Sequence, residues 1–303
     1  MAAELTTGRR VRMNSIRSKV LDYCSLTKPE INVLIVIATS AGYVLGSEVS
    51  VDWWRLARTL IGTLLVASGT ATLNQFMERV HDGEMRRTHN RPVPSGRVRP
   101  QEAMLFGIAL SISGVAYLAI AINPYVAGLA AFTLISYLLV YTPLKRATCL
   151  CTYVGAIPGA TPILIGWYAA RPSINVEAVL LFLVLLIWQF PHFLAIALMY
   201  REDYERASYR MLPAFDTDGI FTRLQIVCFT VALSFLTLWM SFRGSSLIAT
   251  LMMAGVGAAL LYYGIKLARE KSRAAAGHLL RATIIYLPTV FVILVYLKST
   301  AHL

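Results

Sequence analysis

Long apolar runs separated by short polar segments make up most of the chain. Nine runs contain no Asp, Glu, Lys or Arg, namely residues 31–46, 60–77, 103–122, 125–141, 150–170, 178–200, 224–242, 247–265 and 282–297. About 20 consecutive apolar residues form a helix long enough to cross the hydrocarbon core of a bilayer. We therefore expect an all-α integral membrane protein, a bundle of about nine transmembrane helices.

The basic residues are distributed very unevenly between the two sides of these predicted helices. With the N-terminus on the first side, that side collects 23 of the 28 Lys and Arg residues. Cytoplasmic segments of membrane proteins carry such an excess of Lys and Arg. The distribution predicts a cytoplasmic N-terminus and a C-terminus on the outer side.

Composition supports this class of protein. Hydrophobic residues make up 57% and charged residues 15% of the 303 residues, and mean hydropathy is +0.61, whereas soluble domains are about 25% charged. No large soluble catalytic domain fits. The basic loops account for the net charge of +12, so no nucleic-acid partner is expected. The four cysteines are too few and too scattered for a disulfide framework or a zinc site.

The chain divides into two predicted regions. Residues 1–30 form a basic cytoplasmic segment without the apolar core of a cleavable signal peptide. Residues 31–303 form a single transmembrane domain with cytoplasmic loops 78–102 and 200–223. These two loops hold nine of the 16 Asp and Glu residues, which membrane topology does not require. We therefore expect the chemistry in these loops. As the location we expect the inner membrane of a bacterium, with the mitochondrial inner membrane as the alternative.

The first loop follows three polar residues with helical spacing. Asn74, Glu78 and Asp82 lie at i, i+4 and i+8, which places them on one face if the helix continues past its apolar run. A carboxamide and two carboxylates suit Mg²⁺, which usually takes one or two carboxylates, several waters and substrate phosphate. The alternative is a solvated helix end with mixed charges.

Arginines follow this acidic face within fifteen residues. Arg87 and Arg91 are two of four, interleaved with turn-forming residues. Arginine binds phosphate oxygens through two parallel hydrogen bonds, so carboxylates beside arginines predict a site for a metal-chelated diphosphate. Anionic lipid headgroups also attract such arginines, but they do not account for the carboxylates.

Further candidate residues occur in and after three other runs. Lys145 and Arg146 follow the fourth run, and Asp203 and Tyr204 open the second acidic loop. His192 follows Pro191 inside an apolar run, where an imidazole is either a functional group or a hydrogen-bonded packing residue. The fifth run contains two prolines, Pro158 and Pro162, which predict a broken helix beside a cavity.

Together these motifs resemble the intramembrane prenyltransferases of the UbiA type, and within them the branch that farnesylates haem. The resemblance covers nearly the whole chain and rests on Leu26-Thr27-Lys28-Pro29, Asn74-x3-Glu78-x3-Asp82, Arg87 to Pro92 with Gly96, Tyr141-Thr142 with Lys145-Arg146, Gly166-Trp167, Trp188 to Phe193, Asp203-Tyr204 with Met211-Leu212-Pro213, and Tyr286-Leu287-Pro288.

The sequence departs from the family pattern at three places. Glu78 stands where many relatives have Asp, which keeps the carboxylate on a longer arm. Ala207 follows Asp203 by four residues, where quinone-pathway relatives carry another Asp, and this favours haem over 4-hydroxybenzoate as acceptor. The triplet 208–210, Ser-Tyr-Arg, replaces the usual turn of small residues and proline before Met211.

The resemblance implies a reaction and roles for these residues. Farnesyl diphosphate is the implied donor and haem b the acceptor, with haem O and diphosphate as products. Mg²⁺ is implied on Asn74, Glu78 and Asp82, with a second ion near Asp203. The implied contacts to substrate come from residues on several segments: Arg87, Arg91, Lys145, Arg146, His192 and Tyr204. Membrane lipids, and a haem A synthase or a terminal oxidase, are the expected partners.

Other functions stay open at this point. The acceptor of a prenyltransferase is alternatively an aromatic quinone precursor or a chlorophyll-like ring. A basic bundle of nine helices also suits a transporter or a lipid-binding scaffold. A transporter places its charged site near the membrane midplane between inverted repeats, whereas these carboxylates are expected at one membrane face and no clear internal repeat is present. Release of diphosphate that depends on Mg²⁺ separates an enzyme from a transporter.

Overall fold

The structure, a computed structural model, describes residues 17–216, 218–244 and 246–300, so most of the predicted basic segment 1–30 lies outside the described residues. Within those ranges every regular element is a helix. The elements are α2 (Pro29–Gly46), α3 (Trp53–Glu84), α4 (Pro100–Ala121), α5 (Pro124–Ile135), the π-helix η1 (Ser136–Tyr141), α6 (Thr142–Ala147), α7 (Cys151–Ala170), α8 (Val176–Met199), α9 (Arg201–Arg206), α10 (Leu212–Phe215), α11 (Ile220–Phe242), α12 (Leu247–Glu270) and α13 (Arg273–Thr300).

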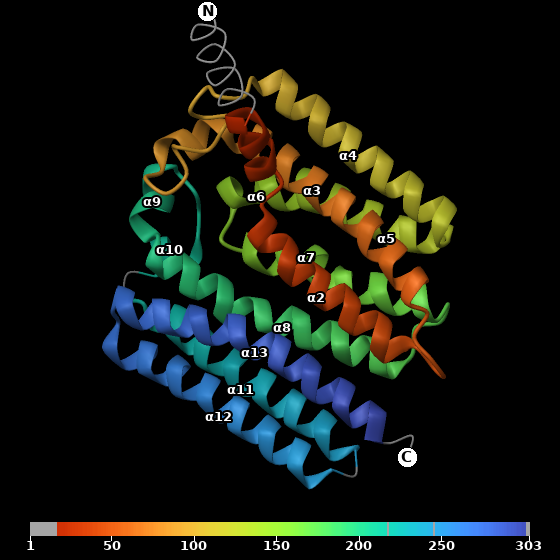
Figure 1. Cartoon of the computed structure of the whole chain (residues 1–303). Helices are drawn as coiled ribbons and strands as arrows, with labels where there is room; N and C mark the ends of the chain where they lie inside the picture. Colours follow the sequence, from red (N-terminus) through yellow and green to blue (C-terminus); the bar gives the residue numbers. More distant parts are fainter. Residues whose placement is uncertain (1–16, 217, 245, 301–303) are drawn as a thin grey trace, which may run out of the picture.

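The long helices lie side by side in one bundle (Figure 1). Among the described residues, eight helical segments are long and apolar enough to cross a membrane. The prediction of an all-helical membrane protein is therefore confirmed, and the chain is a multi-pass integral membrane protein. Of the nine predicted spans, only the run 150–170 is missing from the eight.

That run forms α7, which joins the two ends of the bundle. At its start, the Cys151 thiol lies 3.9 Å from the Met211 sulfur in the second loop. Just beyond its end, Arg171 pairs with Glu48 after α2, at 3.0 Å. Among the described residues, α2 therefore begins at one end of the bundle and α13 finishes at the opposite end. The short helices α9 and α10 lie at the end where α2 begins (Figure 1).

The prediction of a broken helix in this run is wrong, because α7 is continuous from Cys151 to Ala170 with both prolines inside it. Pro162 has no N–H to donate to the carbonyl of Pro158, but the Thr161 hydroxyl donates to that carbonyl at 2.7 Å. Threonine side chains commonly satisfy carbonyls freed by proline in membrane helices. α7 also packs directly on α2, since a Cβ at Gly166 would collide with the Thr39 carbonyl.

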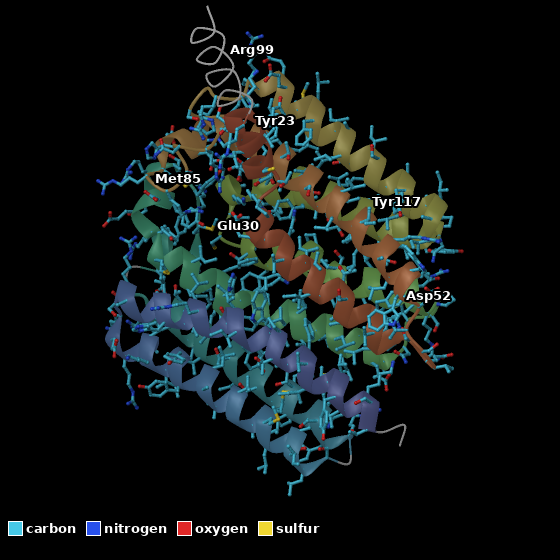
Figure 2. The ribbon with its side chains drawn as sticks, in the orientation of Figure 1. Tyr23, Glu30, Asp52, Met85, Arg99 and Tyr117 are labelled. Carbon is cyan, nitrogen blue, oxygen red and sulfur yellow. The ribbon has the colours of Figure 1, made fainter. Side chains whose placement is uncertain are left out.

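Helix α3 is the element that positions the acidic face. Its 32 residues extend about 48 Å at 1.5 Å per residue, which exceeds the roughly 30 Å of a bilayer core. The Asp52 carboxylate caps its first turn by accepting from the Arg55 amide at 2.9 Å, and Met85 follows its last turn at the other end of the bundle (Figure 2). The polar last turns thus continue the helix beyond its apolar part.

This extension corrects the predicted loop boundaries. Residues 78–84 belong to α3, so the first connection runs over residues 85–99, and the second connection, placed at 200–223, contains the short helices α9 and α10. The helix persists because residues 74, 78 and 82 are buried against other segments, and tertiary packing of one face supplies most of a helix's stability.

Candidate active site

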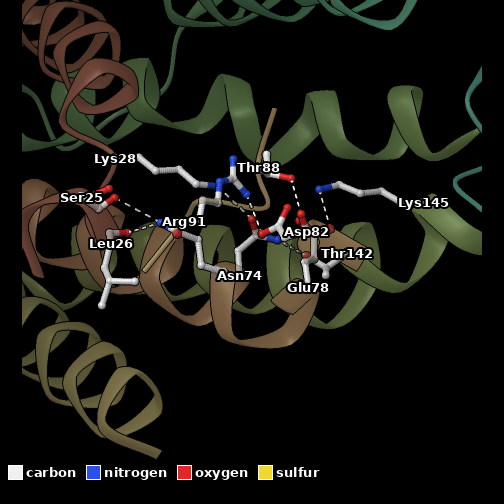
Figure 3. A network of polar contacts seen from close by, with 11 residues as sticks. Ser25, Leu26, Lys28, Asn74, Glu78, Asp82, Thr88, Arg91, Thr142 and Lys145 are labelled. Atoms are coloured by element: carbon white, nitrogen blue, oxygen red, sulfur yellow. Dashed lines mark hydrogen bonds and ion pairs between the residues drawn. The ribbon is translucent and has the colours of Figure 1, made fainter. Parts of the chain in front are cut away.

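Three polar side chains line one face of α3 near its end. Asn74, Glu78 and Asp82 are all buried, with exposed fractions of 1%, 7% and 1%. Figure 3 shows them in a row along the helix, surrounded by side chains from other segments. The spacing of the sequence therefore does place one carboxamide and two carboxylates on one buried face.

A cation from a different segment meets each of these three side chains. Lys28 Nζ donates to Asn74 Oδ1 at 3.1 Å, and Lys145 Nζ lies 2.8 Å from Glu78 Oε1. Arg91 Nη1 lies 2.7 Å from Asp82 Oδ2. Because buried charges are stable only when they are paired, this row of three pairs fixes the entrance to α2, the end of α6 and the first connection on one helix face (Figure 3).

Lys28 is a site residue that the sequence reasoning did not select. Burial, together with the positive charge of Arg91, lowers the pKa of Lys28 to about 7. Its backbone lies in the left-handed region, with φ of 50°, directly before Pro29 starts α2. A single cation at the start of an apolar span was the available signal, but only the fold reveals that it reaches Asn74.

A π-helical segment precedes the contribution from α6. In η1 the hydrogen bonds skip one residue more than in an α-helix, and the Thr142 backbone N–H accordingly donates to the Tyr137 carbonyl. The Thr142 hydroxyl donates to the same carbonyl at 2.9 Å. The Thr142 hydroxyl also accepts from Asn74 Nδ2 at 3.2 Å. Single π-turns occur often at functional sites, and this one comes directly before the residues that turn toward α3. Periodicity of the apolar run alone gives no sign of it.

Asp203 links the two acidic segments. Its Oδ1 accepts from the Arg86 amide at 3.1 Å and its Oδ2 from the Arg87 amide at 3.2 Å, while Arg206 lies 3.5 Å away. The side chain is buried, with 7% exposure. The second loop therefore holds the backbone just after α3, and the two loops singled out in the sequence do meet.

The remaining predicted phosphate ligands differ in their position. Arg87 is exposed, with its guanidinium 4.9 Å from the centre of the Tyr200 ring, and Tyr204 is half-buried in the cluster around Met85 and Tyr209. The structure does not bring Arg146 to the carboxylates: it is exposed and hydrogen-bonds His81 at 3.2 Å. Adjacent residues on a helix point in different directions, so Lys145 and Arg146 meet different side chains of α3, Glu78 and His81.

His192 lies inside the bundle on α8. Its Nδ1 is 2.9 Å from the Thr283 hydroxyl, and its ring stacks on Trp188 with 4.6 Å between ring centres. The Trp188 indole in turn donates to the Thr283 carbonyl at 2.8 Å. Nδ1 is thus engaged, whereas Nε2 makes no hydrogen bond within the described parts of the chain.

The donor set suits Mg²⁺ with help from a ligand. Among the described residues, no group of three His, Cys, Asp or Glu side chains is arranged to hold a metal ion by itself. Mg²⁺ in phosphate-handling sites usually takes one or two carboxylates and completes its shell with waters and substrate oxygens. Glu78 and Asp82, with the carboxamide of Asn74, supply hard oxygen atoms of this kind on a single face.

A cavity lies elsewhere in the bundle. A cavity of about 520 Å³ is lined by Arg171, Glu177 and Lys298, at the end of the bundle opposite to the carboxylate row. Buried carboxylates with paired cations indicate chemistry more directly than the size of a hollow does, so the candidate site is the face of α3.

A row of buried carboxylates flanked by cations, at one end of a membrane-embedded bundle, is the arrangement expected of an enzyme that handles a metal-chelated diphosphate. The chain belongs to the UbiA prenyltransferase family, whose family model matches residues 35–292. It is 44% identical to the Protoheme IX farnesyltransferase of Solibacter usitatus, over 89% of this chain and 96% of that one. It is 36% identical to the enzyme of the same name from Koribacter versatilis, over 96% and 98% of the two chains.

Solved structures share this fold. A UbiA homologue from Archaeoglobus fulgidus, bound to GPP and Mg²⁺, superposes with a TM-score of 0.64 at 13% identity, over 90% of this chain and 99% of that one. A digeranylgeranylglyceryl phosphate synthase superposes with a TM-score of 0.73 at 18% identity, over 92% and 98%. The resemblance drawn from the sequence motifs is thereby confirmed, and a transporter or scaffold is no longer favoured.

Proposed function

We propose that this chain is a protoheme IX farnesyltransferase, which transfers a farnesyl group from farnesyl diphosphate to haem b and yields haem O and diphosphate. The observation that carries this function is the row Asn74, Glu78 and Asp82, each paired with its own cation, in a chain whose relatives at 36% and 44% identity carry that name.

The cations are the proposed binding groups for the diphosphate. Lys28, Lys145 and Arg91 come from three segments and converge on one helix face. Charge-assisted hydrogen bonds from such groups stabilise negative charge as it develops on a leaving diphosphate. Arg87, an exposed residue of the first connection, is a further proposed contact to the diphosphate. Arg146, which hydrogen-bonds His81, the neighbour of Asp82 on α3, is another proposed contact.

The proposed metal ligands are Asn74, Glu78 and Asp82, with Asp203 beside a second ion. When bound, Mg²⁺ supplies Lewis-acid stabilisation of the departing diphosphate oxygens. Asp203 already accepts two backbone amides, and a carboxylate has further lone pairs for a ligand. Its position next to the first connection supports both its contacts to the backbone and its proposed role beside a second metal ion.

The chemistry of transfer balances with water as a co-reactant. The bond between C1 of the farnesyl group and the diphosphate oxygen breaks, and the electron pair leaves with diphosphate. The π electrons of the haem vinyl group then form the new bond to C1. Water adds to the resulting cationic carbon and loses a proton, which leaves a hydroxyethylfarnesyl side chain. The apolar helices keep bulk water from quenching the allylic cation earlier.

His192 is the proposed contact to haem. Thr283 engages its Nδ1, and this leaves Nε2 as the nitrogen available to the iron or to the porphyrin edge. A hydrogen bond to one ring nitrogen commonly fixes which nitrogen binds a metal. Trp188, stacked on the imidazole, holds the ring orientation. Tyr204, beside the site, is the proposed additional contact to substrate.

The expected setting follows from the charge distribution and the bacterial relatives. We propose the bacterial inner membrane, with the N-terminus and the carboxylate end in the cytoplasm, and the mitochondrial inner membrane as the alternative. Haem O serves haem-copper oxidases, so a haem A synthase or a terminal oxidase is the proposed protein partner.

The test compares acceptors with one donor. Purified protein receives farnesyl diphosphate, Mg²⁺ and either haem b or 4-hydroxybenzoate, and prenylated product is measured by mass spectrometry. We expect product from haem b and none from 4-hydroxybenzoate. Product from 4-hydroxybenzoate alone would replace haem as the acceptor, and diphosphate release with neither acceptor prenylated would leave only the donor half of the proposal.

A further inference from the structure

The segment 207–211 reverses direction beside the Lys145–Glu78 pair. Ser208 has a φ of 57°, a left-handed backbone that residues other than glycine rarely adopt. The Tyr209 amide then donates to the Tyr204 carbonyl at 2.9 Å, and the Arg210 amide donates to the Lys145 carbonyl at 2.8 Å. This reversal turns the Tyr209 side chain inward and ties the segment to α6.

Tyr209 is buried among the charged groups of the site. Only 4% of its surface is exposed. Its ring centre is 5.6 Å from that of His81, 6.0 Å from that of Tyr204 and 6.0 Å from Lys145 Nζ. Burial, followed by the negative charge of Glu78, raises the pKa of the Tyr209 phenol. The Tyr209 phenol offers one O–H donor beside the Lys145 ammonium.

The Tyr209 hydroxyl lies close to the Glu78 carboxylate without a well-formed hydrogen bond among the described residues. Buried hydroxyls nearly always have a partner, and one without a partner requires an explanation. Glu78 already has Lys145 as its cation at 2.8 Å, so the hydroxyl is not needed to neutralise it.

We propose that the Tyr209 hydroxyl donates a hydrogen bond to the diphosphate of the prenyl donor, next to the ammonium of Lys145. The proposal rests on the proposed function and adds a donor-binding residue to it. A neutral phenol favours an anionic oxygen over a metal ion, which prefers ionised or carbonyl oxygens. The ammonium of Lys145, beside the ring, is the natural second donor to the same group.

The test is Tyr209→Phe, which removes only the oxygen. Because the hydroxyl makes no well-formed hydrogen bond among the described residues, we expect an unchanged melting temperature. Without its donor, the KM for farnesyl diphosphate should rise about tenfold, which equals about 1.4 kcal/mol, while the KM for haem b is unchanged. Tyr262→Phe removes an exposed hydroxyl on α12 and is the matched control, with both constants unchanged.

A binding measurement separates this inference from the proposed function. Inorganic diphosphate with Mg²⁺ is titrated in detergent into the unchanged protein and into the Tyr209→Phe variant. We expect the variant to bind diphosphate about tenfold more weakly, and this expectation does not depend on haem being the acceptor. Equal diphosphate affinity would overturn the inference. The inference would also be overturned if the Tyr209→Phe variant needed more Mg²⁺ but bound diphosphate with unchanged affinity once Mg²⁺ was saturating. The hydroxyl would then act through Glu78.

Discussion

The Lys145–Glu78 pair gives the most direct test of the electrostatics of the site. The nitrogen and oxygen lie 2.8 Å apart, with side-chain exposures of 11% and 9%. The ammonium also lies 4.6 Å from the centre of the Tyr141 ring. Lys145→Met keeps the apolar stem and removes the charge, and so leaves Glu78 as a buried carboxylate without its cation.

The expected loss follows from the geometry. Removing one partner of a buried ion pair costs about 3–5 kcal/mol, and the end of the bundle is near water, so we take the lower value, about 3 kcal/mol. With an unfolding entropy of about 2.1 cal/mol/K per residue, the 303 residues give a fall of about 5 °C in the melting temperature. The assay is thermal unfolding in detergent.

The double variant makes the result specific to the pair. Glu78→Gln with Lys145→Met removes both charges and should recover most of the lost melting temperature, because neither side chain is then a buried lone ion. Neither protein should turn over substrate. An equal loss in the single and double variants would refute the reasoning, since it would mean that the two charges do not stabilise each other.

Three further predictions concern other parts of the molecule. Asp82→Asn should leave a folded protein that forms less than a hundredth of the normal haem O, and near-normal formation in a mass-spectrometric assay would overturn the metal assignment. His192→Ala should weaken haem retention on purification while inorganic diphosphate still binds with normal affinity, and equal haem affinity in the variant argues against the haem contact. Burial alone raises the pKa of Asp216, but hydrogen bonds from Thr222 outweigh it and lower the pKa; stability from this carboxylate is therefore present above its ordinary pKa of about 3.9 and is lost as the pH falls through the lower folded value. Asp216→Ala should thus reduce the melting temperature more at pH 7 than at a pH below the lowered pKa, and a loss independent of pH would exclude this cause.

The length of the apolar runs predicted the framework of the protein well. Eight of the nine expected spans meet the length and hydropathy of membrane helices, because a span must be apolar over about 20 residues whatever its neighbours are. The row Asn74, Glu78 and Asp82 was also visible, since residues four apart share a helix face. Both features depend only on residues near one another in the sequence.

Features that depend on distant segments were missed. Lys28 reaches Asn74 across 46 positions, and Lys145 reaches Glu78 across 67, and no local pattern encodes such pairs. Arg146 stays a prediction, since it is exposed and hydrogen-bonds His81 on α3 rather than a carboxylate. The prolines of α7 suggested a break that Thr161 makes unnecessary.

The central claim is that this chain farnesylates haem b in a reaction that needs Mg²⁺ and consumes water. The most direct measurement incubates purified protein with haem b, farnesyl diphosphate and Mg²⁺ in water labelled with oxygen-18, with EDTA as the control, and analyses the haems by mass spectrometry. We predict haem O that carries the label, and no product with EDTA. Unmodified haem b in every sample, from protein shown to be folded and to bind diphosphate, would contradict the account.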